Sequence, residues 1–216
     1  MICFLAGPVQ GGKTTAAGEI VSAARKAGVR VGGILCPGKI VAGARTSINV
    51  MDLSTGEASP LADPSDTALR QAQGGERRRT AHSVLRAQGR RKPSGRTCTR
   101  GPGSERVGRF HLTEEGLEFG RRALRSTVRS RAALAVVDEV GLLELAGRGW
   151  ATEINRLVDE YRAYPQGMLL LIVRERLLDR ARAKWGLESA PVVRADDPGG
   201  VGLVLGNLPA EKRPGN

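Results

Sequence analysis

The sequence has few aromatic residues, few histidines and few cysteines. Aromatic side chains make up 3% of its 216 residues, so its core is expected to be aliphatic. Two isolated histidines, His82 and His111, do not suggest a metal cluster. The cysteines, Cys3, Cys36 and Cys98, are scattered and odd in number, which argues against a disulfide framework or a zinc site. Cys3 and Cys36 lie in apolar runs and are expected in the core.

Long apolar segments are also missing. No apolar run reaches the length of about 18 residues that a membrane-spanning helix needs. The short apolar run at residues 1–6 follows no basic segment of the kind that opens a signal peptide. We therefore expect no membrane partner and a cytoplasmic location. The length suits one domain, residues 1–216, with room for an insertion.

Acidic residues are scarce in one particular segment. Residues 70–109 contain 12 basic and two acidic side chains, so they carry ten of the twelve net positive charges. Residues 63–106 are rich in Pro, Gly, Ser, Thr, Gln and Arg, and we interpret them as a basic low-complexity insertion. A basic segment can bind nucleic acid. This one lacks the aromatic residues that stack on bases, so a solvated insertion is favoured over a nucleic-acid partner.

The rest of the chain alternates strand patterns with helix patterns, which predicts an α/β fold. Its mostly parallel central sheet should carry helices on both faces. Alternating residues at 40–53, followed by a turn at 54–57, predict an added antiparallel β-hairpin. Thr113 is the expected N-cap of a helix. Apolar runs predict strands at 1–6, 29–36, 132–137, 168–173 and 191–193, and apolar periodicity predicts helices at 14–27, 113–128, 150–161 and 175–184. The tail after Asp197 is left unassigned.

A glycine-rich motif follows the first strand. Residues 7–14 match G-x-x-x-x-G-K-[ST], and an amphipathic helix follows, as this phosphate-binding motif requires. The glycines let backbone N–H groups approach phosphate oxygens, and the helix N-terminus adds its positive dipole. Lys13 should contact the β- and γ-phosphates, and the Thr14 hydroxyl should bind Mg²⁺. The predicted nucleotide-binding residues in this loop are Gly7, Pro8, Val9, Gln10, Gly11, Gly12, Lys13, Thr14 and Thr15.

Two carboxylates follow the apolar run at 132–137. Asp138 is the expected second ligand of the magnesium ion, either direct or through water. Glu139 should orient or deprotonate an attacking water. A carboxylate beside the magnesium ligand favours hydrolysis over transfer to another acceptor.

Residues 138–145, with the sequence DEVGLLEL, resemble the D-E-[IV]-G-x-[LM]-E-L signature of the THEP1-like nucleoside triphosphatases, also called the cancer-related nucleoside-triphosphatase family. Segments around residues 7–15, 31–34, 44–56, 107–124 and 172–174 resemble that family too. The resemblance covers about residues 1–62 and 107–187. Arg45 is followed by Thr46 where the family usually has Gly-Phe, and residues 63–106 match nothing in it.

The resemblance implies a RecA-like P-loop NTPase domain that hydrolyses ATP, GTP and other nucleoside triphosphates to the diphosphate and phosphate, with Mg²⁺ as cofactor. It carries over Lys13 and Glu139 as catalytic residues, with Thr14 and Asp138 as metal ligands. Arg174 and Arg109 are candidates for balancing charge on the γ-phosphate. Arg174 is expected as a catalytic residue and Arg109 as a nucleotide-binding residue. The alternative is that both are solvated surface arginines. Glu144 carries over as a motif residue without an assigned role.

Two other functions remain open. One is a P-loop phosphotransferase (kinase) with an unknown acceptor, which an acceptor-dependent rate would reveal. The other is a nucleotide-gated regulatory or RNA-binding ATPase, for which RNA binding should weaken steeply as salt rises.

Overall fold

Five strands with nearly continuous apolar sequences form the parallel half of one sheet. They are β1 (Ile2–Gly7), β2 (Val31–Leu35), β8 (Leu134–Val140), β9 (Met168–Arg174) and β10 (Val192–Arg194). The computed structural model describes residues 1–41, 44–64, 105–107 and 110–208. Helices cover both faces of these strands, which is why their sequences do not alternate between polar and apolar residues. Their order is β10-β1-β9-β8-β2, so β9 separates the glycine-rich loop after β1 from the acidic pair on β8.

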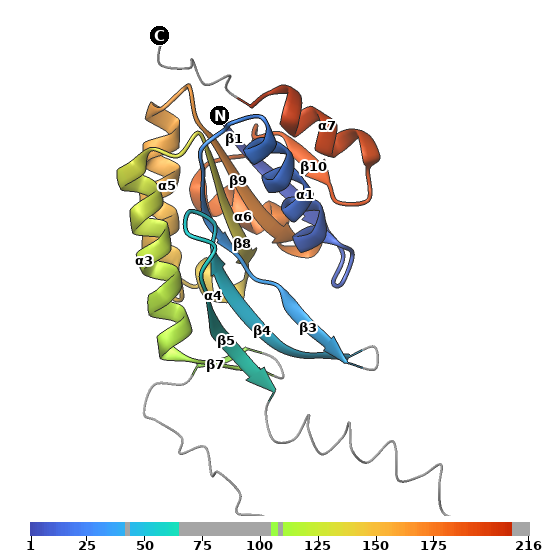
Figure 1. Cartoon of the computed structure of the whole chain (residues 1–216), viewed down its shortest axis with the longest axis vertical. Helices are drawn as coiled ribbons and strands as arrows, with labels where there is room; N and C mark the ends of the chain where they lie inside the picture. The colour runs from blue at the N-terminus through green and yellow to red at the C-terminus, as the bar shows by residue number, and fades with distance from the viewer. Residues whose placement is uncertain (42–43, 65–104, 108–109, 209–216) are drawn as a thin grey trace, which may run out of the picture.

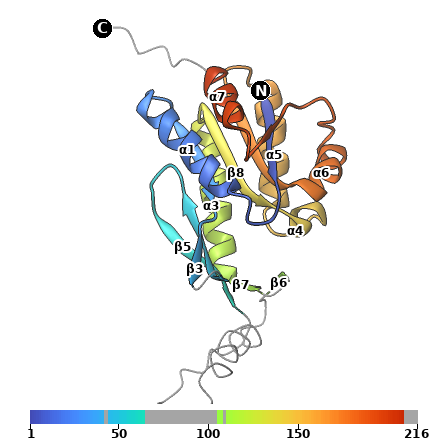
Figure 2. The ribbon, with the colours of Figure 1, turned by 90° about the vertical axis from the view of Figure 1, so that its right-hand side faces the viewer.

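The predicted hairpin is part of a larger antiparallel half. Strand β4 (Ala44–Asp52) pairs with β2, β3 (Gly38–Val41) and β5 (Ala58–Pro64). The sheet continues from β5 through β7 (Phe110–Leu112) to β6 (Glu105–Val107). Ten strands are thus present within the described residues. Figures 1 and 2 show the antiparallel strands extending away from the part of the sheet that helices α6 (Leu178–Trp185) and α7 (Pro198–Gly206) flank.

Two apolar layers hold the helices against the sheet. One layer lies under α1 (Lys13–Lys26) and α7 (Pro198–Gly206), and it includes Ile20, Leu170 and Val204. The other lies under α3 (Glu114–Ser130), α5 (Ala151–Ala163) and α6 (Leu178–Trp185). The prediction of helices on both faces is therefore confirmed. Cys3 and Cys36 are buried in these layers, as expected for small core residues.

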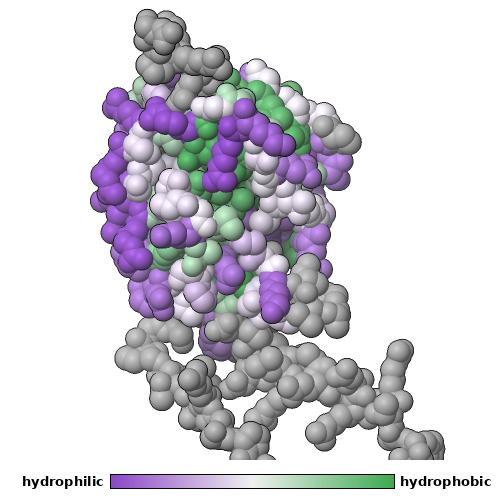
Figure 3. Space-filling view, in the orientation of Figure 1, coloured by the Kyte–Doolittle hydropathy of each residue, from purple (hydrophilic) through white to green (hydrophobic). Residues whose placement is uncertain are grey.

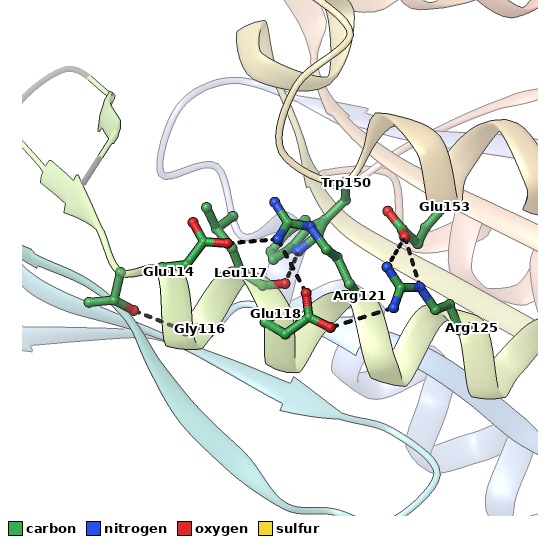
Figure 4. A network of polar contacts seen from close by, with 9 residues as sticks. Glu114, Gly116, Leu117, Glu118, Arg121, Arg125, Trp150 and Glu153 are labelled. Atoms are coloured by element: carbon green, nitrogen blue, oxygen red, sulfur yellow. Dashed lines mark hydrogen bonds and ion pairs between the residues drawn. The ribbon is translucent and has the colours of Figure 1, made fainter. Parts of the chain in front are cut away.

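Helix α3 begins where the sequence predicts. Thr113 is its N-cap, and its hydroxyl accepts a hydrogen bond from the Gly116 N–H at 3.1 Å. Figure 4 shows how side chains then join α3 to the start of α5. The Trp150 indole N–H donates to the Leu117 carbonyl at 3.0 Å. Further along, Arg125 pairs with buried Glu153, N to O 3.0 Å. These contacts fix the segment that follows the acidic pair.

The C-terminal helix α7 is missing from the sequence prediction. Asp197 caps it by accepting from the Gly199 N–H at 2.9 Å, and α7 packs against α1. Figure 3 shows hydrophobic surface in the region of α7, whose Leu203 is exposed. The described helices include none with the length and apolar character needed to cross a bilayer. Most of the predicted insertion at 63–106 lies outside the described residues.

Candidate active site

The loop between β1 and α1 is curled by two residues with left-handed backbone. Gln10 has φ 61° and Gly12 has φ 72°. The Gly11 N–H donates to the Pro8 carbonyl at 3.1 Å, which closes the loop on itself. A side chain on Gly11 would not fit there, because its Cβ would lie 2.6 Å from Cγ of Pro8. The sequence motif thus forms the tight backbone curve that a phosphate-binding loop needs.

Helix α1 starts directly from this loop. Its N-cap is Gly12, which has no side chain to bond the first-turn N–H groups. The positive end of the helix dipole therefore faces the loop, and both features suit a bound anion. Lys13 folds back over the loop, and its Nζ donates to the Pro8 carbonyl at 2.6 Å.

Asp138 is the buried acid of this site, with 2% of its surface exposed. Its Oδ2 accepts from the Thr14 hydroxyl at 2.9 Å and from the Cys36 N–H at 3.0 Å. Its Oδ1 accepts from the Glu139 N–H at 2.8 Å. Burial raises the pKa of Asp138, the nearby Glu139 charge raises it further, and the three hydrogen bonds oppose the rise.

Glu139 stands beside Asp138 in a strained conformation. Its φ of 58° lies in the left-handed region, and the pairing of β8 with β9 shifts register between Val137 and Val140. The bulge corrects the sequence expectation that the acidic pair follows the strand, because β8 runs on to Val140. The Glu139 carboxylate lies 3.5 Å from the Arg174 guanidinium, Oε2 to Nη2.

A pocket of about 810 Å³ opens beside these residues. Most of the predicted site residues line it, including Lys13, Thr14, Asp138, Glu139 and Arg174. The full lining is Val9, Gln10, Gly11, Gly12, Lys13, Thr14, Thr15, Leu35, Pro37, Gly38, Met51, Phe110, Asp138, Glu139, Val140, Leu142, Ile172, Arg174 and Arg176. A pocket of this size is ordinary for a nucleotide-sized ligand.

Three predicted residues stand apart from that lining. Gly7 ends β1, and a Cβ there would meet Cγ of Lys13 at 3.3 Å. Pro8 supplies the carbonyl that holds both Gly11 and Lys13. Both therefore shape the loop. Arg109 lies outside the described residues, so its role stays a prediction.

Sequence reasoning missed one wall of the pocket and one cation. Leu35 ends β2, Pro37 lies in the short link from β2 to β3, and Met51 lies in β4, where the sequence carries no chemical signal. Arg176 also lines the pocket, two residues beyond the predicted Arg174. The basic residues after an apolar strand were the signal that could have revealed it.

Glu144 acts on the backbone of its own segment. It is 4% exposed, and its carboxylate accepts from the Gly141 N–H at 3.0 Å and the Trp150 N–H at 3.4 Å. Burial raises its pKa. Glu144 does not line the pocket; it holds the loop that follows Glu139.

The oxygen atoms of Thr14 and Asp138 fit a magnesium ion. They converge at 2.9 Å on the wall of the pocket, and Mg²⁺ prefers oxygen ligands. Within the described part of the chain, no group of three or more His, Cys, Asp or Glu side chains is placed to hold a metal. Mg²⁺ usually takes one or two protein ligands and completes its shell with water and phosphate oxygens.

The parallel sheet, its loop-to-helix anion site and the buried aspartate together define the protein class, a P-loop NTPase fold. A family model described as NTPase matches residues 2–75. Nucleoside-triphosphatase THEP1 of Archaeoglobus fulgidus is 35% identical over 85 residues, which are 39% of this chain and 48% of that protein. The matched segment thus spans about half the length of this relative.

Two solved structures share the fold along nearly the whole chain. A human cancer-related nucleoside triphosphatase has a TM-score of 0.57 and 19% identity, covering 94% of this chain and 92% of the other. THEP1 from Aquifex aeolicus has a TM-score of 0.57 and 15% identity, covering 95% of both chains. The chain is thus similar in its N-terminal sequence and in its fold to THEP1-like nucleoside triphosphatases, the family that the sequence resembles.

Proposed function

We propose that this protein is a magnesium-dependent nucleoside triphosphatase that converts ATP, GTP and other nucleoside triphosphates to the diphosphate and phosphate. The observation that supports it best is the pair Asp138 and Glu139 on the wall of the pocket that also holds the phosphate loop. Asp138 is buried and bonded to Thr14, whereas Glu139 is partly exposed in the pocket. The two acids therefore have different surroundings and suit different roles.

In this proposal the phosphate loop binds and orients the triphosphate. First-turn N–H groups of α1 and the loop backbone contact phosphate oxygens, and Lys13 exchanges the Pro8 carbonyl for them. Thr14 and Asp138 would hold the magnesium ion, which supplies charge neutralisation at the β- and γ-phosphates when bound. The bulge at Glu139 aims its carboxylate into the pocket, where it accepts a proton from the attacking water. Water adds to the γ-phosphorus while the bond between the γ-phosphorus and the β–γ bridging oxygen breaks.

Arg174 and Arg109 remain proposals for balancing charge on the γ-phosphate. Arg174 lines the pocket and is well placed for this role. A cytoplasmic location, and the preference for a solvated insertion over one that binds nucleic acid, also stay predictions of the sequence.

The test measures phosphate release from ATP, GTP and CTP with Mg²⁺. Lys13→Ala should lose nucleotide binding, and Glu139→Gln should keep binding while its turnover falls about 10²- to 10⁴-fold, the usual effect of removing a general base. Matched controls are Lys26→Ala at the other end of α1, and Glu160→Gln, whose carboxylate pairs with Arg131. Both controls should match the wild type.

Normal turnover in Glu139→Gln would show that another group activates the water. Tight nucleotide binding without phosphate release would argue against the hydrolase. Release that appears only when a second substrate is added would favour the phosphotransferase.

A further inference from the structure

The ion pair between Glu139 and Arg174 lies in the proposed reaction space. The strand order places β9 between β1 and β8, and Arg174 is the last residue of β9. Its Cα is paired with that of Gly7, where the phosphate loop begins. On its other side, its guanidinium lies 3.5 Å from the Glu139 carboxylate. Arg174 therefore stands between the phosphate loop and the proposed base.

This pair is loose enough to be exchanged. The two side chains are 34% and 27% exposed, and an ion pair with this much solvent access contributes little to stability. Both side chains line the pocket, so an incoming ligand can reach them. The separation of 3.5 Å is longer than a well-formed charge-assisted hydrogen bond of about 2.7–2.9 Å.

A terminal phosphate competes for Arg174 on favourable terms. It carries more negative charge than a carboxylate, and the planar guanidinium can bind two of its oxygens at once. The same phosphate repels the Glu139 carboxylate across the pocket. Both effects favour an exchange in which Arg174 moves from Glu139 to the phosphate. A diphosphate with its two phosphates on the loop has no group at that position.

We propose that Arg174 is the residue by which this site distinguishes a triphosphate from a diphosphate, and that its pair with Glu139 is the contact that the terminal phosphate displaces. The exchange also removes the Arg174 contact from the Glu139 carboxylate, so that contact holds the proposed base only while no γ-phosphate is present. This proposal rests on the proposed nucleotide site, but it concerns binding and does not require hydrolysis to be measured.

The experiment is a binding cycle with full-length protein, Mg²⁺, a non-hydrolysable ATP analogue and ADP. The variants are Glu139→Gln, Arg174→Met and the double variant, and thermal unfolding confirms that each folds. Arg174→Met should lower the affinity for the analogue by at least about tenfold, the lower end of the range for losing a hydrogen bond to a charged group. The affinity for ADP should not change. Arg174→Lys should restore part of the preference, since it keeps the charge.

The cycle separates exchange from simple repulsion. Glu139→Gln should raise the affinity for the analogue more in the wild-type background than in the Arg174→Met background. Only the wild-type background has an Arg174 side chain that the substitution frees from Glu139. Arg176→Met is the control, since Arg176 lines the same pocket without a carboxylate partner among the described residues. Arg176→Met should lower the affinities for the ATP analogue and for ADP, and its effect should be the same with or without Glu139→Gln.

Equal tightening in the two backgrounds would overturn the exchange. An unchanged ratio of analogue to ADP affinity in Arg174→Met would overturn the assignment of specificity. A wild-type protein that binds the analogue without hydrolysing ATP would contradict the proposed hydrolase, while the affinity ratios would still decide this inference. Absence of any analogue binding would overturn both.

Discussion

Replacing Thr14 by Val tests whether the Thr14 hydroxyl and Asp138 form one functional unit. Val keeps the shape and the β-branch of Thr, so the change removes little more than the hydroxyl. Asp138 is buried, and its Oδ2 would keep only the Cys36 N–H of its two donors. A hydrogen bond to a charged group is worth about 1.5–3 kcal/mol. Because Thr14 is only half-buried, water can replace part of the lost hydrogen bond to Asp138. The free energy of unfolding is therefore expected to fall by about 1.5 kcal/mol.

The assay is urea unfolding of the nucleotide-free protein, with Thr14→Ser as the control that keeps the hydroxyl. In thermal unfolding of a chain of this length, a loss of about 1.5 kcal/mol in the free energy of unfolding corresponds to a Tm lower by about 3–6 °C. A second measurement adds Mg²⁺ and a non-hydrolysable triphosphate. Saturating ligand at 100 times its Kd stabilises the wild type by about 2.7 kcal/mol, and each tenfold loss of affinity removes about 1.4 kcal/mol of that.

Both effects should appear in Thr14→Val and be much smaller in Thr14→Ser. If Thr14→Val unfolds at the same urea concentration as Thr14→Ser and is stabilised equally by the magnesium complex, the hydroxyl holds neither Asp138 nor the metal. The proposed ligand pair would then be wrong.

Three further predictions concern the frame of the site. Gly120→Ala places a Cβ 2.6 Å from the Trp150 indole nitrogen, so urea unfolding should show a loss of about 1–3 kcal/mol; an unchanged midpoint would mean that α3 shifts freely. Tyr161→Phe removes the buried bond from the phenol to the Ala132 carbonyl, 2.5 Å, and should cost about 1–1.5 kcal/mol in the same assay, whereas a neutral result would show that the carbonyl finds another donor. Burial raises the pKa of Glu144 above its ordinary value near 4.5, so the folded protein binds the proton more tightly than the unfolded chain, and the free energy of unfolding should fall as pH rises from about 4 through the raised pKa. Glu144→Gln should lack this component, so the difference between wild-type and variant stability should change with pH, and a constant difference would contradict the assignment.

The parts of the fold that short-range sequence determines were predicted well. The phosphate loop, the Thr113 cap and the strands β1 and β9 each depend on neighbouring residues, and the structure confirms their positions. Helix α7 was missed because its sequence, PGGVGLVLG, has low helix propensity. Packing against α1 and the cap at Asp197 stabilise it instead, and neither is visible locally.

The site contacts that escaped prediction join strands far apart in the chain. The Cys36 N–H reaches Asp138 because β2 pairs with β8, and the contact uses a backbone group that any residue would supply. The pairing of Arg174 with Glu139 requires β9 to lie next to β8. Residue types in the sequence indicated which groups carry the chemistry, but strand order decides which of them meet.

The antiparallel strands have a consequence for how this fold accommodates changes in chain length. The segment after Pro64 leaves from β5, and the chain returns at β6. Pro64 pairs with Phe110 of β7, and Glu105, where the chain returns, pairs with Leu112 at the other end of β7, so the sheet fixes both attachment points. Once the ends are fixed by the sheet, doubling the length of the intervening segment costs only about 0.6 kcal/mol of closure entropy. Homologues with much shorter or longer segments here can therefore keep the same sheet and the same phosphate site.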